Sequence, residues 1–282
     1  GMRIALRLFP GLWLALLVAA PLVLVGIMAL SWQAEGVPPV APFWRGGGIN
    51  ADNFALILGD PFYRDAFAQS LLLAGVTAAL CVALALPMAL AVARARRPAL
   101  MLALVVLPLW CGLVLRAGAW IGLLRDEGWV NGALRWLGWI EAPVPLLYSQ
   151  TALFLGMVSA YLPFAVLPLV AALARLDPAI EEAAADLGAG RTRAFLDATL
   201  PRAWPGVAAA FLLVLIPAAG EYVVPELLGP QSVQPAGRAL FAEFFANRDW
   251  PVAAALAMAL LVLLLAPLLV FQRLNRAGDD RP

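Results

Sequence analysis

The side chains that most often carry covalent chemistry are scarce in this sequence. It contains no His and no Lys, so all 19 basic residues are Arg. Without His the chain lacks an imidazole for acid–base catalysis or metal binding, and without Lys it cannot form a Walker-type phosphate loop. Cys81 and Cys111 both lie in apolar stretches and are expected to be buried thiols. We therefore expect no catalytic residue, no metal site and no cofactor bound by this chain.

Carboxylates inside apolar sequence remain as candidates for function. Glu221 follows a long run of apolar and small residues and precedes Tyr222. An ionised group within a membrane is costly and usually faces a cavity or a partner. Two interpretations stay open: Glu221 lines a path for a solute, or it pairs with a structural arginine such as Arg116.

The elements that position these groups are predicted to be membrane helices. Of the 282 residues 63% are apolar and 13% are charged, whereas a soluble domain is nearer one half and one quarter. A net charge of +1 gives no reason to expect nucleic acid binding. We predict an all-α, polytopic helical bundle in the lipid bilayer. About six windows are long and apolar enough to cross it: residues 9–31, 67–93, 99–123, 148–174, 204–229 and 251–272.

The arginines predict the orientation of these spans. If both termini are cytoplasmic, the basic turn 94–97 and the long loop 175–203 face the cytoplasm, and most arginines lie on that side. Basic residues are enriched in cytoplasmic loops. We therefore predict a multi-pass protein of a bacterial inner membrane with both termini in the cytoplasm.

The loop 175–203 is predicted to begin with a short, well-capped helix. Asp177 is a good N-cap, and Pro178 suits the first helical position. Glu181 and Glu182 lie early in the helix, where carboxylates complement the helix dipole.

A turn and a second helix are predicted to follow. Gly188 and Gly190 can supply the left-handed residue that ends a helix. A second amphipathic helix is expected from about Thr192 and should stop before Pro201. A short helix held away from the membrane suits docking into another protein, although a surface linker remains the alternative.

The spacing in this loop resembles the EAA signature of the permease subunits of binding-protein-dependent ABC importers. Glu182-Ala183-Ala184 is followed by Gly188 and then by Leu200-Pro201, with Ala198 in place of the usual Ile. In that family the segment is the coupling helix, which sits in a cleft of the ATPase subunit. The resemblance implies that ATPase coupling involves Glu181, Glu182, Ala183, Ala184, Asp186 and Gly188.

The resemblance extends from about Ser70 to Arg273 and is closest to permeases of spermidine/putrescine importers, within those to the putrescine type. Among the stretches that carry it are Ala160-Tyr-Leu-Pro-Phe164 and Glu243-Phe-Phe-Ala-Asn247. It implies one permease domain over residues 1–282 with the type I importer fold. It also implies three kinds of partner: a second permease subunit forming a heterodimer, a cytoplasmic ATPase dimer that binds ATP and Mg²⁺, and a periplasmic substrate-binding protein.

A polyamine substrate would require carboxylates and aromatic faces along its path, because cations are attracted to aromatic rings. The candidates for this translocation path are Glu221, Tyr222, Glu226, Trp110 and Tyr161.

Other functions are compatible with parts of the sequence. Related permeases carry phosphonates, opines, iron or thiamine, and differ mainly in the substrate path. A secondary transporter or channel would lack an ATPase-docking loop. A membrane-embedded enzyme would need clustered His, Cys or paired carboxylates, and the carboxylates here are scattered.

Overall fold

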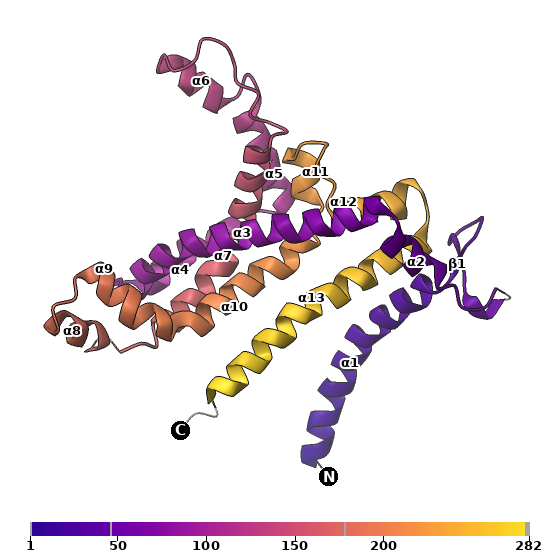
Figure 1. The fold of residues 1–282 in the computed structure, drawn as a ribbon, viewed down its shortest axis with the longest axis horizontal. Helices are drawn as coiled ribbons and strands as arrows, with labels where there is room; N and C mark the ends of the chain where they lie inside the picture. Colours follow the sequence, from indigo (N-terminus) through magenta and orange to yellow (C-terminus); the bar gives the residue numbers. More distant parts are fainter. Residues whose placement is uncertain (1, 46, 178, 280–282) are drawn as a thin grey trace. The chain divides into compact units, whose positions relative to one another are not determined.

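The computed structural model describes residues 2–45, 47–177 and 179–279. Most of these residues are helical (Figure 1). The chain forms two compact units, which are treated separately below. Unit 1 comprises residues 1–68 and 236–265, and unit 2 comprises residues 69–235 and 266–282.

Unit 1 joins the first and last long helices to a small irregular region. A buried cluster that includes Ala29, Ile57, Tyr63 and Leu256 packs these elements together. The two strands pair antiparallel, with Trp32 opposite Ala41. Its elements are α1 (Met2–Ala29), β1 (Trp32–Gln33), β2 (Val40–Ala41), η1 (Phe43–Arg45), α2 (Asp52–Gly59), the start of α3 (Pro61–Ala93), α12 (Ala236–Phe241), the π-helical turn η4 (Ala242–Ala246) and most of α13 (Trp250–Asp279).

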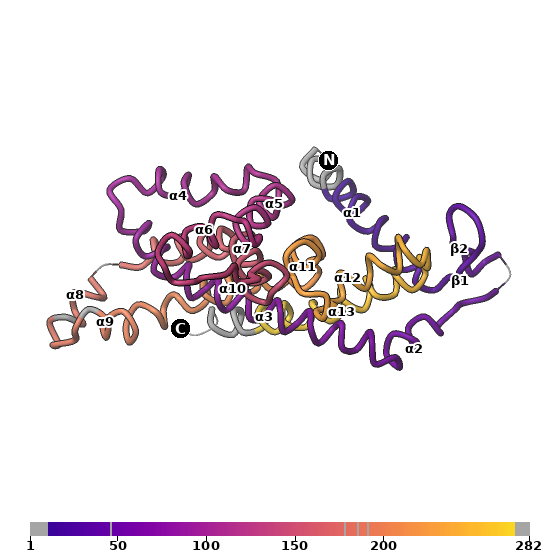
Figure 2. Tube along the Cα trace, turned by 90° about the horizontal axis from the view of Figure 1, so that it is seen from above, coloured from indigo at the N-terminus to yellow at the C-terminus, as the bar shows by residue number. Residues whose placement is uncertain are grey.

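Unit 2 contains both candidate sites. Within it, α8 and α9 lie at one end of the α7–α10 pair and α11 lies at the other (Figures 1 and 2). Besides the rest of α3, its elements are α4 (Pro98–Val106), η2 (Leu107–Trp110), α5 (Leu113–Leu124), α6 (Trp129–Trp136), α7 (Gln150–Leu173), α8 (Ala179–Asp186), α9 (Arg191–Ala194), the π-helical turn η3 (Phe195–Thr199), α10 (Leu200–Ala219) and α11 (Val223–Leu228).

Helix α7 is the central helix of unit 2. It packs against α10, α11, α5 and α4, and over half of its apolar stretch is buried. Small residues allow the close approaches, as is common between membrane helices. A Cβ atom added at Gly206 on α10 would collide with the Ala172 side chain, and one at Gly156 would collide with Leu228 and Val224 of α11.

Five described helices are long and apolar enough to cross a membrane, or up to six if one bent pair forms a single span. That pair covers the window predicted at 99–123. The structure breaks this window: Pro98–Trp110 and Leu113–Trp136 meet at 86°. Pro108 lacks an N–H and disfavours a continuing helix. Cys111 at the break is exposed, so the expectation of a buried thiol is wrong there, whereas Cys81 is buried as expected.

Two helix ends also differ from the sequence expectation. The helix from Thr192 runs through Pro201 into α10 and does not stop. In the π-helical turn η3 the Leu200 N–H donates to the Phe195 carbonyl, five residues back instead of four. The wider turn lies just before Pro201, which has no N–H to donate. At the other end α10 finishes at Ala219, and residues 220–222 separate it from α11.

Candidate functional site

Helix α8 has the caps that the sequence predicts. The Asp177 carboxylate accepts the Ala179 N–H at 3.0 Å, which confirms Asp177 as the capping residue, while Pro178 lies outside the described residues. At the far end Gly188 has φ of +85°, and the Ala189 N–H donates to the Ala184 carbonyl at 3.0 Å. This is a Schellman-type end, which favours glycine at that position.

Five of the six residues proposed for coupling lie on two faces of this helix, and the sixth, Gly188, follows its end. Glu182, Ala183 and Asp186 are exposed, and Leu187 beside them is 90% exposed. Within the described part of the chain Glu182 makes no hydrogen bond or ion pair. We call these four residues the outer face of α8. Glu181 and Ala184 are half-buried and lie on the opposite, inner face.

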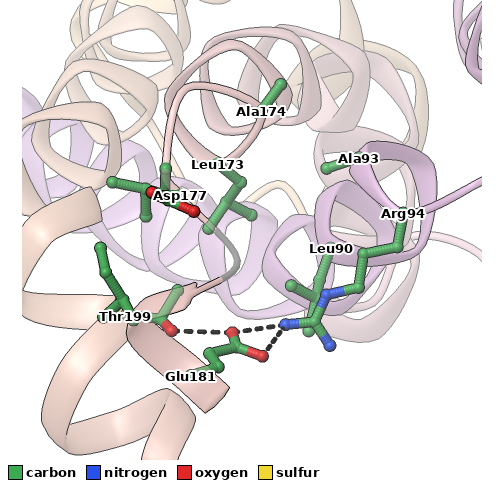
Figure 3. A pocket seen from close by; sticks show the side chains of 10 residues that line it. Leu90, Ala93, Arg94, Leu173, Ala174, Asp177, Glu181 and Thr199 are labelled. Atoms are coloured by element: carbon green, nitrogen blue, oxygen red, sulfur yellow. Dashed lines mark hydrogen bonds and ion pairs between the residues drawn. The ribbon is translucent and has the colours of Figure 1, made fainter. Parts of the chain in front are cut away.

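Glu181 on the inner face joins three elements (Figure 3). The Arg94 guanidinium, just past the end of α3, donates to both of its carboxylate oxygens. The hydroxyl of buried Thr199, in η3, donates to Oε1 at 2.7 Å. A cavity of about 330 Å³ adjoins this cluster, and its lining includes Leu90 and Leu173.

Glu221 lies in the break between α10 and α11 and is only 8% exposed. Its Oε1 accepts the backbone N–H groups of Val223 at 2.8 Å and Val224 at 3.4 Å. The Tyr161 hydroxyl, from α7, donates to Oε2. The carboxylate therefore caps α11 and receives its hydrogen bonds from neutral donors, which complement a negative charge at a helix start.

The alternative pairing of Glu221 with Arg116 is absent from the described ion pairs. Arg116 on α5 instead donates to the carbonyls of Ser159 and Ala160 on α7, at 3.3 and 3.5 Å. Helices α5, α7 and α11 pack against one another. Arg116 therefore fixes α5 to α7, while Glu221 fixes α11 to α7.

The five candidates for the translocation path differ in how exposed they are. A direct hydrogen bond joins Glu221 to Tyr161, which is 8% exposed. Tyr222 is half-buried and Glu226 on α11 is exposed. Trp110, at the end of η2, is 85% exposed.

Three important residues were not found from sequence. In the sequence Arg94 stands out only as part of a basic turn and Thr199 only as part of a predicted helix, and nothing marks Gly156. No local pattern signals their contacts, because Arg94 and Glu181 are 87 positions apart and Gly156 meets α11 only in the folded chain.

The comparison with protein families decides the class of this chain. The model for the binding-protein-dependent transport system inner membrane component matches residues 2–277. The chain belongs to this family. It is a transport permease component with the fold and the membrane-spanning helices that the sequence predicted.

Curated relatives of this permease chain agree with the family. It is 33% identical over 231 residues to the spermidine/putrescine transport system permease protein PotB of Haemophilus influenzae, covering 81% of this chain and 80% of the relative. It is 32% identical over 228 residues to PotB of Escherichia coli K12, covering 80% and 82%. These matches confirm the predicted resemblance to polyamine importer permeases.

A solved structure confirms the fold. A chain of the bacterial alginate ABC transporter, in complex with an alginate pentasaccharide-bound periplasmic protein, superposes with a TM-score of 0.73 at 18% identity. The match covers 99% of this chain and 95% of that one. The permease chain therefore has the fold of an ABC importer permease over nearly its whole length.

Proposed function

We propose that this chain is one permease subunit of an ATP-driven importer that takes up a polyamine, putrescine or spermidine. The observation that carries the proposal is the identity of about one third with PotB proteins over four fifths of both chains. The matched length includes most of the membrane helices, so the likeness concerns the transport machinery itself.

The outer face of α8 is proposed to bind the ATPase subunit. An exposed carboxylate, Glu182, lies on this short helix, and an almost fully exposed apolar side chain, Leu187, directly follows its end. Interface cores combine such apolar anchors with charges that complement the partner. The ATPase dimer would bind ATP and Mg²⁺ in the cytoplasm, a second permease subunit would complete a heterodimer, and a periplasmic protein would deliver the solute. Both termini would then be cytoplasmic.

The break between α10 and α11 is proposed to line the translocation path. Interrupted helices are tolerated in membranes where they line a cavity or pack within protein. Glu226 and Trp110 are the exposed candidates for direct contact with a cation. Glu221 and Tyr161 satisfy each other and hold α11 in place, so in this conformation their proposed part is to shape the path, with Tyr222 beside them.

The proposal is tested by uptake into proteoliposomes. The chain is reconstituted with its second permease subunit, ATPase and binding protein, and uptake of radiolabelled putrescine and spermidine is measured with and without ATP. We expect uptake that requires both ATP and the binding protein. ATP-independent uptake would indicate a secondary transporter and would contradict the proposal. ATP-dependent uptake of a phosphonate, an opine, iron or thiamine, with no polyamine uptake, would keep the importer and overturn the substrate.

A further inference from the structure

We propose that Glu181 is a positioning residue that connects the coupling helix α8 to α3 through Arg94 and to the start of α10 through Thr199. The inference rests on the proposed function, because it assumes that an ATPase moves α8. The sequence resemblance implies ATPase coupling for both Glu181 and Glu182. The inference gives these two neighbours different roles.

The hydrogen bonds of Glu181 favour an internal role. Both carboxylate oxygens receive the Arg94 guanidinium, and Oε1 also receives the Thr199 hydroxyl (Figure 3). A carboxylate has few remaining acceptor positions once it accepts three hydrogen bonds. Glu182 lies on the outer face and is exposed, so of the two glutamates it is Glu182 that is available to a cation on the ATPase.

The packing around the ion pair shows why this link matters. Helix α8 packs against α9 and η3, which follow it directly in the chain. Its approach to the ends of α3 and α7 leaves a cavity of about 330 Å³ lined by Leu90, Leu173 and Ile180. Apolar packing alone therefore does not fill the space between α8 and α3, and the Arg94–Glu181 pair spans it.

The charges suit the ends of the helices that they join. Arg94 lies at the C-terminal end of α3 and Glu181 in the first turn of α8, so each charge complements the dipole of its own helix. The Arg94 side chain is 53% exposed and the Glu181 side chain 29%. Ion pairs this exposed contribute little to folding stability. Loss of the pair should therefore leave the complex assembled and affect mainly the transmission of movement.

The test measures putrescine transported per ATP hydrolysed by the reconstituted complex. We expect Arg94→Glu and Glu181→Arg each to lower this ratio about fivefold, within the usual range of coupling between sites. The double variant, which restores the pair with reversed charges, should recover most of it. Arg96→Glu is the matched control, since Arg96 lies in the same basic turn and is exposed, and it should keep the wild-type ratio.

Two milder variants keep the test decisive if the reversals prevent assembly. Glu181→Gln removes the charge, and Thr199→Val removes only the hydroxyl that donates to Glu181. A lowered ratio with normal amounts of complex supports the positioning role. Wild-type ratios in all single variants, or no recovery in the double variant, would overturn it. Absence of ATP-driven putrescine uptake by the wild-type complex would instead contradict the proposed function.

Discussion

The two glutamate sites of unit 2 satisfy a carboxylate with different kinds of hydrogen-bond donor. Glu181, in the first turn of α8, is half-buried and pairs with Arg94. Glu221, at the α10–α11 break, is buried and receives a tyrosine hydroxyl and two backbone N–H groups. Full burial of an ion pair carries a large desolvation cost. Neutral donors at a helix start stabilise the buried charge without burying a second one.

This difference suggests that the two sites serve different purposes. Removing Glu221 leaves buried donors without an acceptor, which is costly. Removing a partly exposed pair near α8 costs little stability. We therefore expect changes at the α10–α11 break to act on stability, and changes around α8 to act on coupling. The following substitutions test that division, from the largest expected effect on stability to the smallest.

The largest loss of stability is expected for Glu221→Leu. The Val223 N–H and the Tyr161 hydroxyl would lose their acceptor, which should cost about 3 kcal/mol. The melting temperature of the purified complex measures the effect. The control is Glu141→Leu in an exposed loop position, expected to change stability by less than about 0.5 kcal/mol. Equal melting temperatures for the two variants would refute the capping role of Glu221.

Gly156→Ala should cost about 2 kcal/mol, because the added methyl group overpacks the contact of α7 with α11. The new Cβ would lie 2.8 Å from Val224 Cγ1 and would also collide with Leu228. Gly118→Ala on α5 is the matched control, since a Cβ there meets nothing within 4 Å. If thermal unfolding gives the same stability for both variants, α11 does not depend on the close approach at Gly156.

Gly188→Val should destabilise the end of α8 by about 1–2 kcal/mol, the cost of a side chain in a left-handed conformation. A Cβ at this position meets nothing within 4 Å, so the effect comes from backbone conformation. We expect loss of substrate-stimulated ATP hydrolysis with the complex intact. Gly188→Asn, which tolerates this conformation better, should retain most of the stimulation. Full stimulation in Gly188→Val would show that this end of α8 is not needed for coupling.

The smallest effect is expected for Asp197→Asn, which breaks the exposed pair with Arg193 four residues away. Helix pairs of this kind contribute about 0.3–0.5 kcal/mol. Both the melting temperature and the amount of putrescine transported per ATP hydrolysed should stay near wild type. A clear drop in the ratio would mean that any charge change near α8 disturbs coupling, and would weaken the specific assignment of Glu181.

Local sequence predicted the elements of α8 well, because capping depends on neighbouring residues. Asp177 and Gly188 perform the roles that their types and spacing indicate. Hydropathy likewise located most membrane helices. The continuation through Pro201 was missed because a π-helical turn compensates for the missing N–H, and no sequence rule signalled that turn.

The connections between elements could not be predicted in the same way. Glu221 stands out in the sequence by its apolar surroundings, yet its hydrogen-bond partner is Tyr161, 60 positions away, and not Arg116. The sequence suggests Tyr161 for the same path on chemical grounds and does not indicate that the two side chains touch. The Arg94–Glu181 pair and the Gly156–Leu228 approach likewise depend on how helices pack, which hydrophobic periodicity does not specify.

The proposed role of α8 is tested most directly by ATP hydrolysis of the reconstituted complex in response to putrescine-loaded binding protein. Glu182→Arg reverses the exposed charge on the outer face of α8 without removing any internal contact found in the described chain. We expect the variant complex to lose most of the stimulation, while the melting temperature of the complex stays unchanged. Stimulation equal to that of the wild type would contradict the proposal that this face of α8 binds the ATPase.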